Sequence, residues 1–227
     1  MAFVIYIICI LSLVGLTGYV MYLIFGTNEL TIQKSVYNLL FCVFGIIFVH
    51  VVIFCYKVFR MRFPIYLNIY ILLAVTLFAF SSVFRFFDNI IYLDKTLHTI
   101  SGAMITVVGF SIGYMFFKRE RYSEISPLFI AIFAFSFSLA IGALWEIFEF
   151  AIDFTMNQNM QRWRDNPMGW GGRGSGLVDT MMDLILHTGA ALIIAIAFGL
   201  WMKKYPADER ILITKFNRNE TNKSIES

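Results

Sequence analysis

The feature that most constrains the fold of this chain is a set of six runs of apolar residues. Each run is long enough to cross the hydrocarbon core of a membrane, which takes about 20 helical residues. They cover residues 3–26, 36–56, 66–84, 97–117, 127–154 and 178–202. With 59% hydrophobic and only 15% charged residues, the chain has more apolar surface than a soluble domain tolerates. We therefore predict an all-α polytopic membrane protein, a bundle of six transmembrane helices formed by residues 1–202.

The distribution of basic residues predicts the orientation, because Lys and Arg near the ends of spans stay on the cytoplasmic side. With a cytoplasmic N-terminus, twelve of the 18 Lys and Arg residues fall in cytoplasmic segments and six in outer loops. Both termini are therefore expected in the cytoplasm. Residues 203–227 form a polar tail that cannot bury a core, so we expect it to be disordered. Basic residues at helix ends do not form a nucleic-acid-binding patch.

Ionisable residues within the apolar runs are the best candidates for a functional interior, because a charge in lipid is costly. In sequence order they are Asp94 and His98, then Glu146 and Glu149, then Asp179, Asp183 and His187. Spacings of three or four residues place each group on one face of its helix. The predicted topology puts all three groups in the outer half of the membrane. We expect them to meet in one chamber.

The segments that begin at Asp94 and Asp183 have similar sequences, and each contains a glycine. Asp94 and His98 are separated by the same spacing as Asp183 and His187, and each His is followed by a Gly-Ala pair at Gly102 or Gly189. We expect both glycines to allow close approach of neighbouring helices. Ordinary packing of small residues in a membrane also accounts for them.

Three motifs carry a resemblance to a known family. They are Asp94-Lys95-x-x-His98-x-x-x-Gly102, Glu146-x-x-Glu149, and Asp179-Thr180-x-x-Asp183-x-x-x-His187-Thr188-Gly189-Ala190. The pattern resembles the YjdF-like family of small bacterial inner-membrane proteins over about residues 85–200. It is more distantly similar to the VanZ-like family, associated with glycopeptide resistance, which has Gln in place of Glu149 and Asn in place of His187. The resemblance implies a multi-pass protein of the bacterial plasma membrane, without an established activity.

The donor types in the chamber suit a divalent metal. Imidazole and carboxylate groups together bind Zn²⁺, Mn²⁺ or Fe²⁺, and a metal would reduce the cost of gathering acids in a low dielectric. The expected ligands are His98, Glu146, Glu149, Asp183 and His187, with Asp94 and Asp179 as orienting groups or general bases. We therefore predict a metal-dependent hydrolase or transferase acting on a lipid or lipid-linked cell-envelope substrate. The motifs lack H-E-x-x-H and other strong metal signatures.

Two other functions are compatible with the same residues. Acids and histidines inside a membrane also relay protons or bind cations in transporters, although a cluster near one face gives no clear pair of alternating-access halves. A homodimer would alter that argument. In the other alternative, these residues bond to one another and stabilise the helix bundle of a non-enzymatic envelope or resistance protein.

The longest predicted outer loop, about residues 155–177, is rich in arginine and glycine. We expect Arg162, Arg164 and Arg173 to bind an anionic head group, because the guanidinium group binds phosphate through two hydrogen bonds. The alternative is a flexible connector whose tryptophans anchor at the membrane interface.

Overall fold

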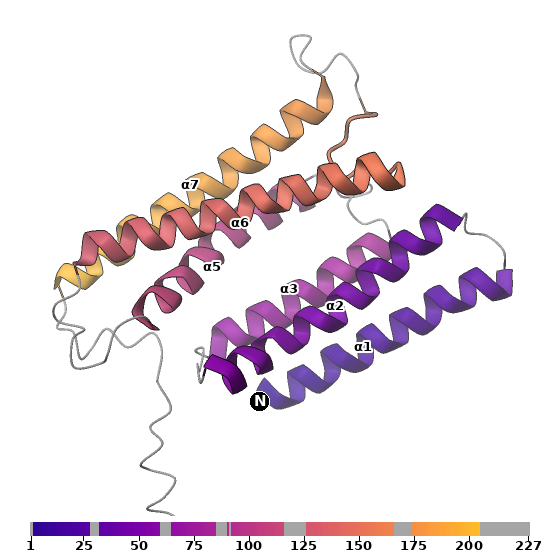
Figure 1. The fold of residues 1–227 in the computed structure, drawn as a ribbon, viewed down its shortest axis with the longest axis horizontal. Helices are drawn as coiled ribbons and strands as arrows, with labels where there is room; N and C mark the ends of the chain where they lie inside the picture. The colour runs from indigo at the N-terminus through magenta and orange to yellow at the C-terminus, as the bar shows by residue number, and fades with distance from the viewer. Residues whose placement is uncertain are drawn as a thin grey trace, which may run out of the picture. The chain divides into compact units, whose positions relative to one another are not determined.

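The computed structural model describes residues 2–27, 32–59, 65–84, 90, 92–115, 126–165 and 174–204, and all regular elements in these ranges are helical. In chain order they are α1 (Ala2–Tyr22), the π-helical turn η1 (Leu23–Thr27), α2 (Ile32–Phe59), α3 (Ile65–Val83), α5 (Leu93–Met115), α6 (Pro127–Met156) and α7 (Ser175–Lys204) (Figure 1). The all-α prediction is confirmed. Each predicted apolar run coincides with one helix, and the ends differ by a few residues.

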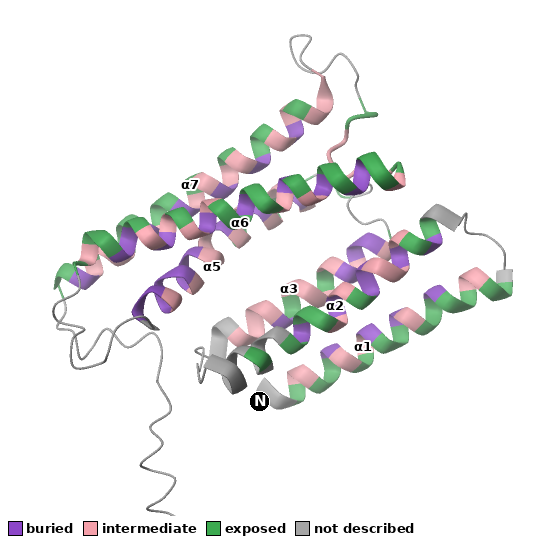
Figure 2. Cartoon of the chain, viewed as in Figure 1, coloured by how far each residue is buried: buried purple, intermediate pink, exposed green. Residues whose placement is uncertain are grey.

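Four helical segments are long and apolar enough to cross a membrane: Val4–Gly26, Leu93–Tyr114, Pro127–Met156 and Ser175–Lys204. The described apolar parts of α2 and α3 are shorter, at Lys34–His50 and Asn68–Val83. Exposed residues occur along these helices (Figure 2). They include large apolar side chains such as Phe154 at 80% and Ile193 at 68%. Such surfaces suit a lipid environment.

The chain forms two compact units, one containing α1 to α3 and the other α5 to α7. In the first unit, one side of each helix contributes to an apolar core. Its buried residues are Cys9, Leu13, Leu16, Val20, Cys42, Val49, Leu72 and Ala79. Because these side chains recur at helical spacing, they give each helix one buried face.

In the second unit, α5, α6 and α7 each pack against the other two. One end of this unit is largely apolar, where the rings of Phe110 and Phe198 stack with centroids 5.0 Å apart and the Tyr114 hydroxyl contacts the Met202 sulfur at 2.8 Å. The opposite end contains the beginnings of α5 and α7 and the end of α6. The ionisable residues lie there.

Two glycines bring the backbones of this unit close together. A Cβ atom on Gly102 would overlap the His187 carbonyl group, which shows direct backbone contact between α5 and α7. A Cβ on Gly109 would lie 2.9 Å from Ala134 Cα on α6. The prediction for Gly102 is confirmed, whereas that for Gly189 is wrong, because a Cβ there meets no atom within 4 Å. Gly189 lies two residues after buried His187 and therefore on the opposite side of α7.

Candidate functional site

The structure brings the predicted polar stripes together at one end of the second unit. Its buried ionisable residues are Asp94 and His98 on α5, Glu146, Glu149 and Asp153 on α6, and Asp179, Asp183 and His187 on α7. Gly142 of α6 lies against His187 of α7, and earlier Ala131 lies against later Gly199. Helix α6 therefore runs opposite to α7, and its last turns meet the first turns of α7 and of the parallel α5. We call these residues, together with Lys95, the polar cluster.

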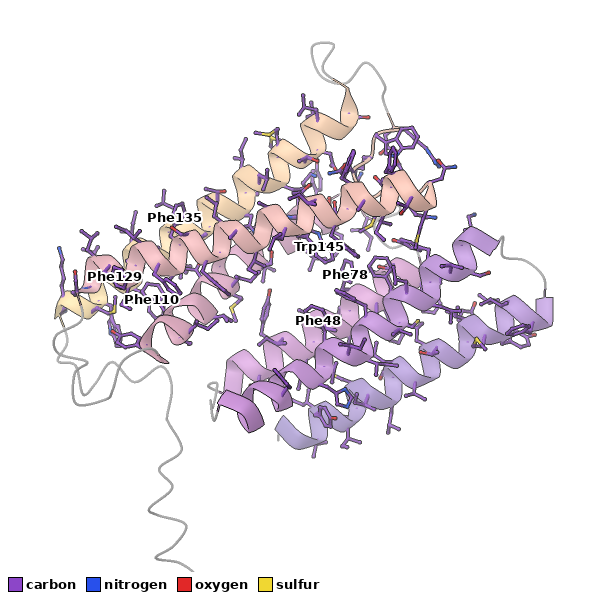
Figure 3. All side chains as sticks on the ribbon, viewed as in Figure 1. Phe48, Phe78, Phe110, Phe129, Phe135 and Trp145 are labelled. Atoms are coloured by element: carbon purple, nitrogen blue, oxygen red, sulfur yellow. The ribbon has the colours of Figure 1, made fainter. Side chains whose placement is uncertain are left out.

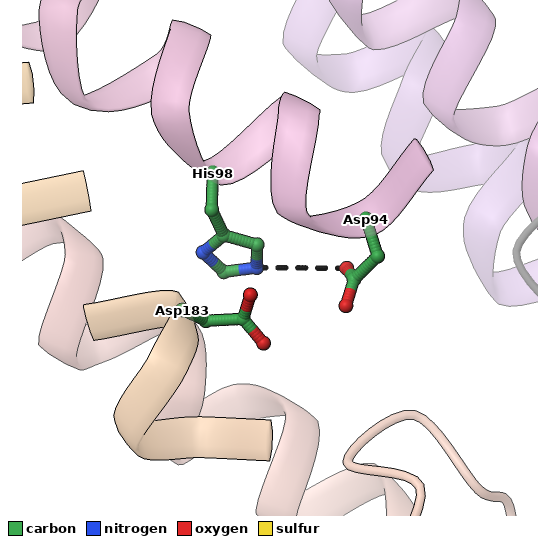
Figure 4. Close-up of side chains that lie close together, drawn as sticks. All are labelled: Asp94, His98 and Asp183. Carbon is green, nitrogen blue, oxygen red and sulfur yellow. Dashed lines mark ion pairs between the residues drawn. The ribbon is translucent and has the colours of Figure 1, made fainter. Parts of the chain in front are cut away.

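Asp94, His98 and Asp183 form a group of possible metal ligands. Each offers one donor atom, and these atoms lie within 4.8 Å of one another (Figure 4). His98 Nε2 lies 3.7 Å from Asp94 Oδ1, and His98 Nδ1 lies 3.7 Å from Glu146 Oε1. Both distances exceed those of hydrogen bonds, so the imidazole lies between two carboxylates without bonding directly to either.

Lys95 is the main residue that the sequence analysis did not assign to the site. Its Nζ atom lies 2.5 Å from Asp179 Oδ1, 2.6 Å from Asp183 Oδ2 and 3.3 Å from Asp94 Oδ2. In the sequence, Lys95 stands in the motif Asp94-Lys95-x-x-His98 and is one of the six basic residues assigned to outer loops. Its position directly after Asp94 is the one signal that could have placed it in the cluster, because the long side chain can reach carboxylates on a neighbouring helix.

Several buried carboxylate oxygens have no hydrogen-bond partner among the residues that the structure describes. They are both side-chain oxygens of Glu146, Oδ2 of Asp179 and Oδ1 of Asp183. Asp183 is 1% exposed and Glu146 is 5% exposed. Because an ionised carboxylate buried without a partner is costly, these atoms favour binding of a cation or protons in the cluster.

Glu149 and His187 are buried but satisfied by neighbours. Trp145 lies on α6 (Figure 3). Its indole donates to Glu149 Oε1 at 2.7 Å. His187 Nε2 lies 2.9 Å from the Ser138 carbonyl oxygen, and its Nδ1 lies 3.5 Å from the Ser101 hydroxyl. Neither residue belongs to the group formed by Asp94, His98 and Asp183. Their predicted ligand roles stay predictions.

The segment after α6 folds back on the polar cluster through Asp153 and Gln161. The Asp153 carboxylate accepts hydrogen bonds from the backbone N–H groups of Met160 at 2.7 Å and Gln161 at 2.9 Å. The Gln161 amide donates to the Thr180 hydroxyl at 2.8 Å and to the Glu146 carbonyl at 3.3 Å. These contacts join the segment to α6 and α7. Specific hydrogen bonds of this kind leave no periodic pattern in the sequence, so they could not be predicted from it.

The two arginines in the described part of this loop have different surroundings. Arg162 Nε lies 3.8 Å from Asp179 Oδ1, so this side chain reaches the polar cluster. Arg164 donates to the Asn157 carbonyl at 2.8 Å, and its guanidinium lies 4.6 Å from the centre of the Trp163 ring. Arg164 thus contacts residues of its own loop. Arg173 lies outside the described residues.

A family model described as "Predicted membrane protein (DUF2238)" matches residues 3–204. The match includes the N-terminal helices and therefore extends beyond the segment that carries the resemblance to YjdF-like proteins. It is consistent with that resemblance, whereas the likeness to VanZ-like proteins stays a prediction. No curated protein and no solved structure matches the chain.

Proposed function

The chain belongs to the DUF2238 family of predicted membrane proteins, and we propose that its polar cluster binds a divalent cation used in hydrolysis or group transfer. The observation that carries this proposal is the convergence of Asp94, His98 and Asp183, whose donor atoms lie within 4.8 Å of one another. Carboxylate and imidazole donors together suit Zn²⁺, Mn²⁺ or Fe²⁺.

The charge of the cluster supports a bound cation. Besides Asp153, whose carboxylate accepts two backbone hydrogen bonds, the cluster contains five buried carboxylates, at Asp94, Glu146, Glu149, Asp179 and Asp183. Among the described residues, the cations paired with them are Lys95 and Arg162, which leaves three formal negative charges when the imidazoles are neutral. A divalent cation would leave one. Fewer uncompensated charges make the cluster less costly to bury in a membrane.

Three protein donors are typical of a catalytic metal, because such a site keeps a coordination position for water or substrate. A metal there would supply a nucleophilic water and stabilise negative charge in the transition state. Glu146 is the best candidate for a general base, since it lies beside His98 and neither carboxylate oxygen has a hydrogen-bond partner within the described ranges. In this proposal Asp94 is a ligand, whereas Asp179 is held by Lys95 and positions the cluster.

The proposed substrate is a lipid or lipid-linked molecule of the bacterial cell envelope. Six spans with both termini in the cytoplasm, as the Lys and Arg count favours, would open the cluster toward the outer side of the plasma membrane. Arg162, next to Asp179, is then suitably placed to bind a phosphate group of a substrate entering from the outer leaflet.

Lys95 favours a second candidate function, proton- or cation-coupled transport. Its ammonium group already lies between carboxylates, and networks of this kind exchange protons or cations in membrane transporters. The two functions differ in whether the substrate is chemically changed.

The metal content of detergent-purified protein, measured by mass spectrometry after dialysis against Zn²⁺, Mn²⁺ or Fe²⁺, tests the metal site. We expect near-stoichiometric metal in the wild type and its loss in Asp183→Asn, which removes a charge without changing side-chain shape. The matched control is Asp165→Asn, because that carboxylate is 50% exposed in the loop. A folded wild type that binds no metal under any of these conditions would contradict the proposal.

A second experiment separates enzyme from transporter. The protein is reconstituted into vesicles of bacterial total lipid that contain added lipid-linked envelope precursors. The vesicles are incubated with the metal ion that the protein binds, and the lipids before and after incubation are compared by mass spectrometry. A lipid consumed by wild type but not by Asp183→Asn would support the enzyme. Unchanged lipids, together with acidification of the vesicle interior when a gradient of metal ions or protons is applied, would support the transporter.

A further inference from the structure

Asp94 and Asp183 each direct their two carboxylate oxygens toward different surroundings. Their Oδ2 atoms lie 3.3 Å and 2.6 Å from Lys95 Nζ. Asp94 Oδ1 lies 3.7 Å from His98 Nε2, and Asp183 Oδ1 has no hydrogen-bond partner among the described residues. One oxygen of each carboxylate is therefore used by Lys95, and the other is left for a second cation.

The surroundings of the Lys95 ammonium resemble those of a bound cation. Oxygens of Asp94, Asp179 and Asp183 surround Nζ, one for each of its three N–H donors. The Lys95 side chain is 23% exposed, whereas that of Asp183 is 1% exposed, so the ammonium reaches the buried acids from the rim of the cluster.

We infer that Lys95 is a tethered second cation, which occupies one of two neighbouring cation positions and limits the chain to one external divalent ion. The inference rests on the proposed metal site. Carboxylates that bridge two cations are typical of two-metal hydrolases. In this chain the ammonium group of Lys95 supplies one of the two positive charges. Asp94 and Asp183 would then bridge the ammonium and the external ion, whereas Asp179, outside the group of possible metal ligands, contacts the ammonium and Arg162.

Equilibrium dialysis of the detergent-purified full chain against MnCl₂ tests the inference. Lys95→Met keeps the length of the side chain and removes its charge, so its carboxylates should accept a second ion. We expect Lys95→Met to bind one more Mn²⁺ per chain than wild type does, and Lys95→Arg to bind the same number as wild type. An equal or smaller number in Lys95→Met would overturn the inference.

Asp179→Asn provides a second test that does not depend on the folding of Lys95→Met. This variant keeps Lys95 and removes only a carboxylate assigned to it, so the number of bound Mn²⁺ ions should equal that of wild type. Loss of an ion would overturn the assignment of Asp179 to Lys95. The wild-type number tests the proposed metal site itself, whereas the differences between variants test the role of Lys95, so the two failures are distinguishable.

Discussion

The Nε2 atom of His187 lies 2.9 Å from the backbone carbonyl oxygen of Ser138, so this imidazole donates a hydrogen bond across the interface between α7 and α6. Gly142 lies against the same ring, and a Cβ atom there would come within 3.0 Å of it. His187 is thus enclosed by the helix packing and 2% exposed. Its surroundings favour a role in holding the three helices together.

Replacement of His187 by Ala should therefore destabilise the protein and leave metal binding largely intact. The loss of a buried interhelical hydrogen bond should cost about 1–2 kcal/mol of unfolding free energy. Unfolding by denaturant in detergent measures it. Ile185→Ala is the matched control, because Ile185 lies on the same helix and is 56% exposed. Equal stability of the two variants would contradict the assigned role.

Gly102→Ala and Gly189→Ala should differ strongly although both add one methyl group. The methyl group at position 102 would overlap the His187 carbonyl, whereas the one at position 189 meets no atom within 4 Å. We expect Gly102→Ala to lose about 1–3 kcal/mol of stability through overpacking. Gly189→Ala should be neutral or stabilising by up to about 1 kcal/mol, because Ala favours a helix. Thermal unfolding in detergent tests this, and similar midpoints would argue against the close approach of α5 and α7.

Arg162→Gln and Arg164→Gln separate the two roles assigned to the loop arginines. Arg162 lies beside Asp179 and is proposed to bind an anionic head group, whereas Arg164 binds Asn157 in its own loop. Loss of one charge-assisted hydrogen bond should weaken binding of an anionic phospholipid roughly tenfold in Arg162→Gln. Native mass spectrometry with phosphatidylglycerol measures the binding. An equal effect of both substitutions would show that only general positive charge is involved.

The proposed orientation predicts the behaviour of reporter fusions in a bacterium. Alkaline phosphatase fused after Ser227 should be inactive and a green fluorescent protein there fluorescent, because the C-terminus is expected in the cytoplasm. The same reporters inserted after Asp165 should give the opposite results. Active phosphatase at the C-terminus would place the polar cluster on the cytoplasmic side and exclude an outer-leaflet substrate.

Much of the fold could be predicted because its determinants are local. Apolar runs predicted all the helices that the structure describes, and i, i+4 spacing correctly placed Asp94 with His98 and Asp179 with Asp183 on buried faces. The number of membrane spans and their orientation stay predictions. The separate compact units that hold α1 to α3 and α5 to α7 depend on contacts between helices, which a linear pattern of apolar residues does not contain.

The partners of individual site residues could not be predicted to the same degree. Spacing shows which face of α7 contains His187, but not which residue of α6 lies opposite, and that residue is the small Ser138. Lys95 is a basic residue at a helix end, where such residues usually reflect topology. Its contact with Asp179 depends on how α5 and α7 pack, so only the structure assigns it to the polar cluster.

Electron paramagnetic resonance of the Mn²⁺-loaded protein tests the central claim most directly, because coupling of the metal to ¹⁴N identifies a histidine ligand. Asp94, His98 and Asp183 form the proposed site, so the coupling should be present in wild type and in His187→Gln and absent in His98→Gln. Bound Mn²⁺ without nitrogen coupling in wild type, or coupling that disappears in His187→Gln and persists in His98→Gln, would contradict the account.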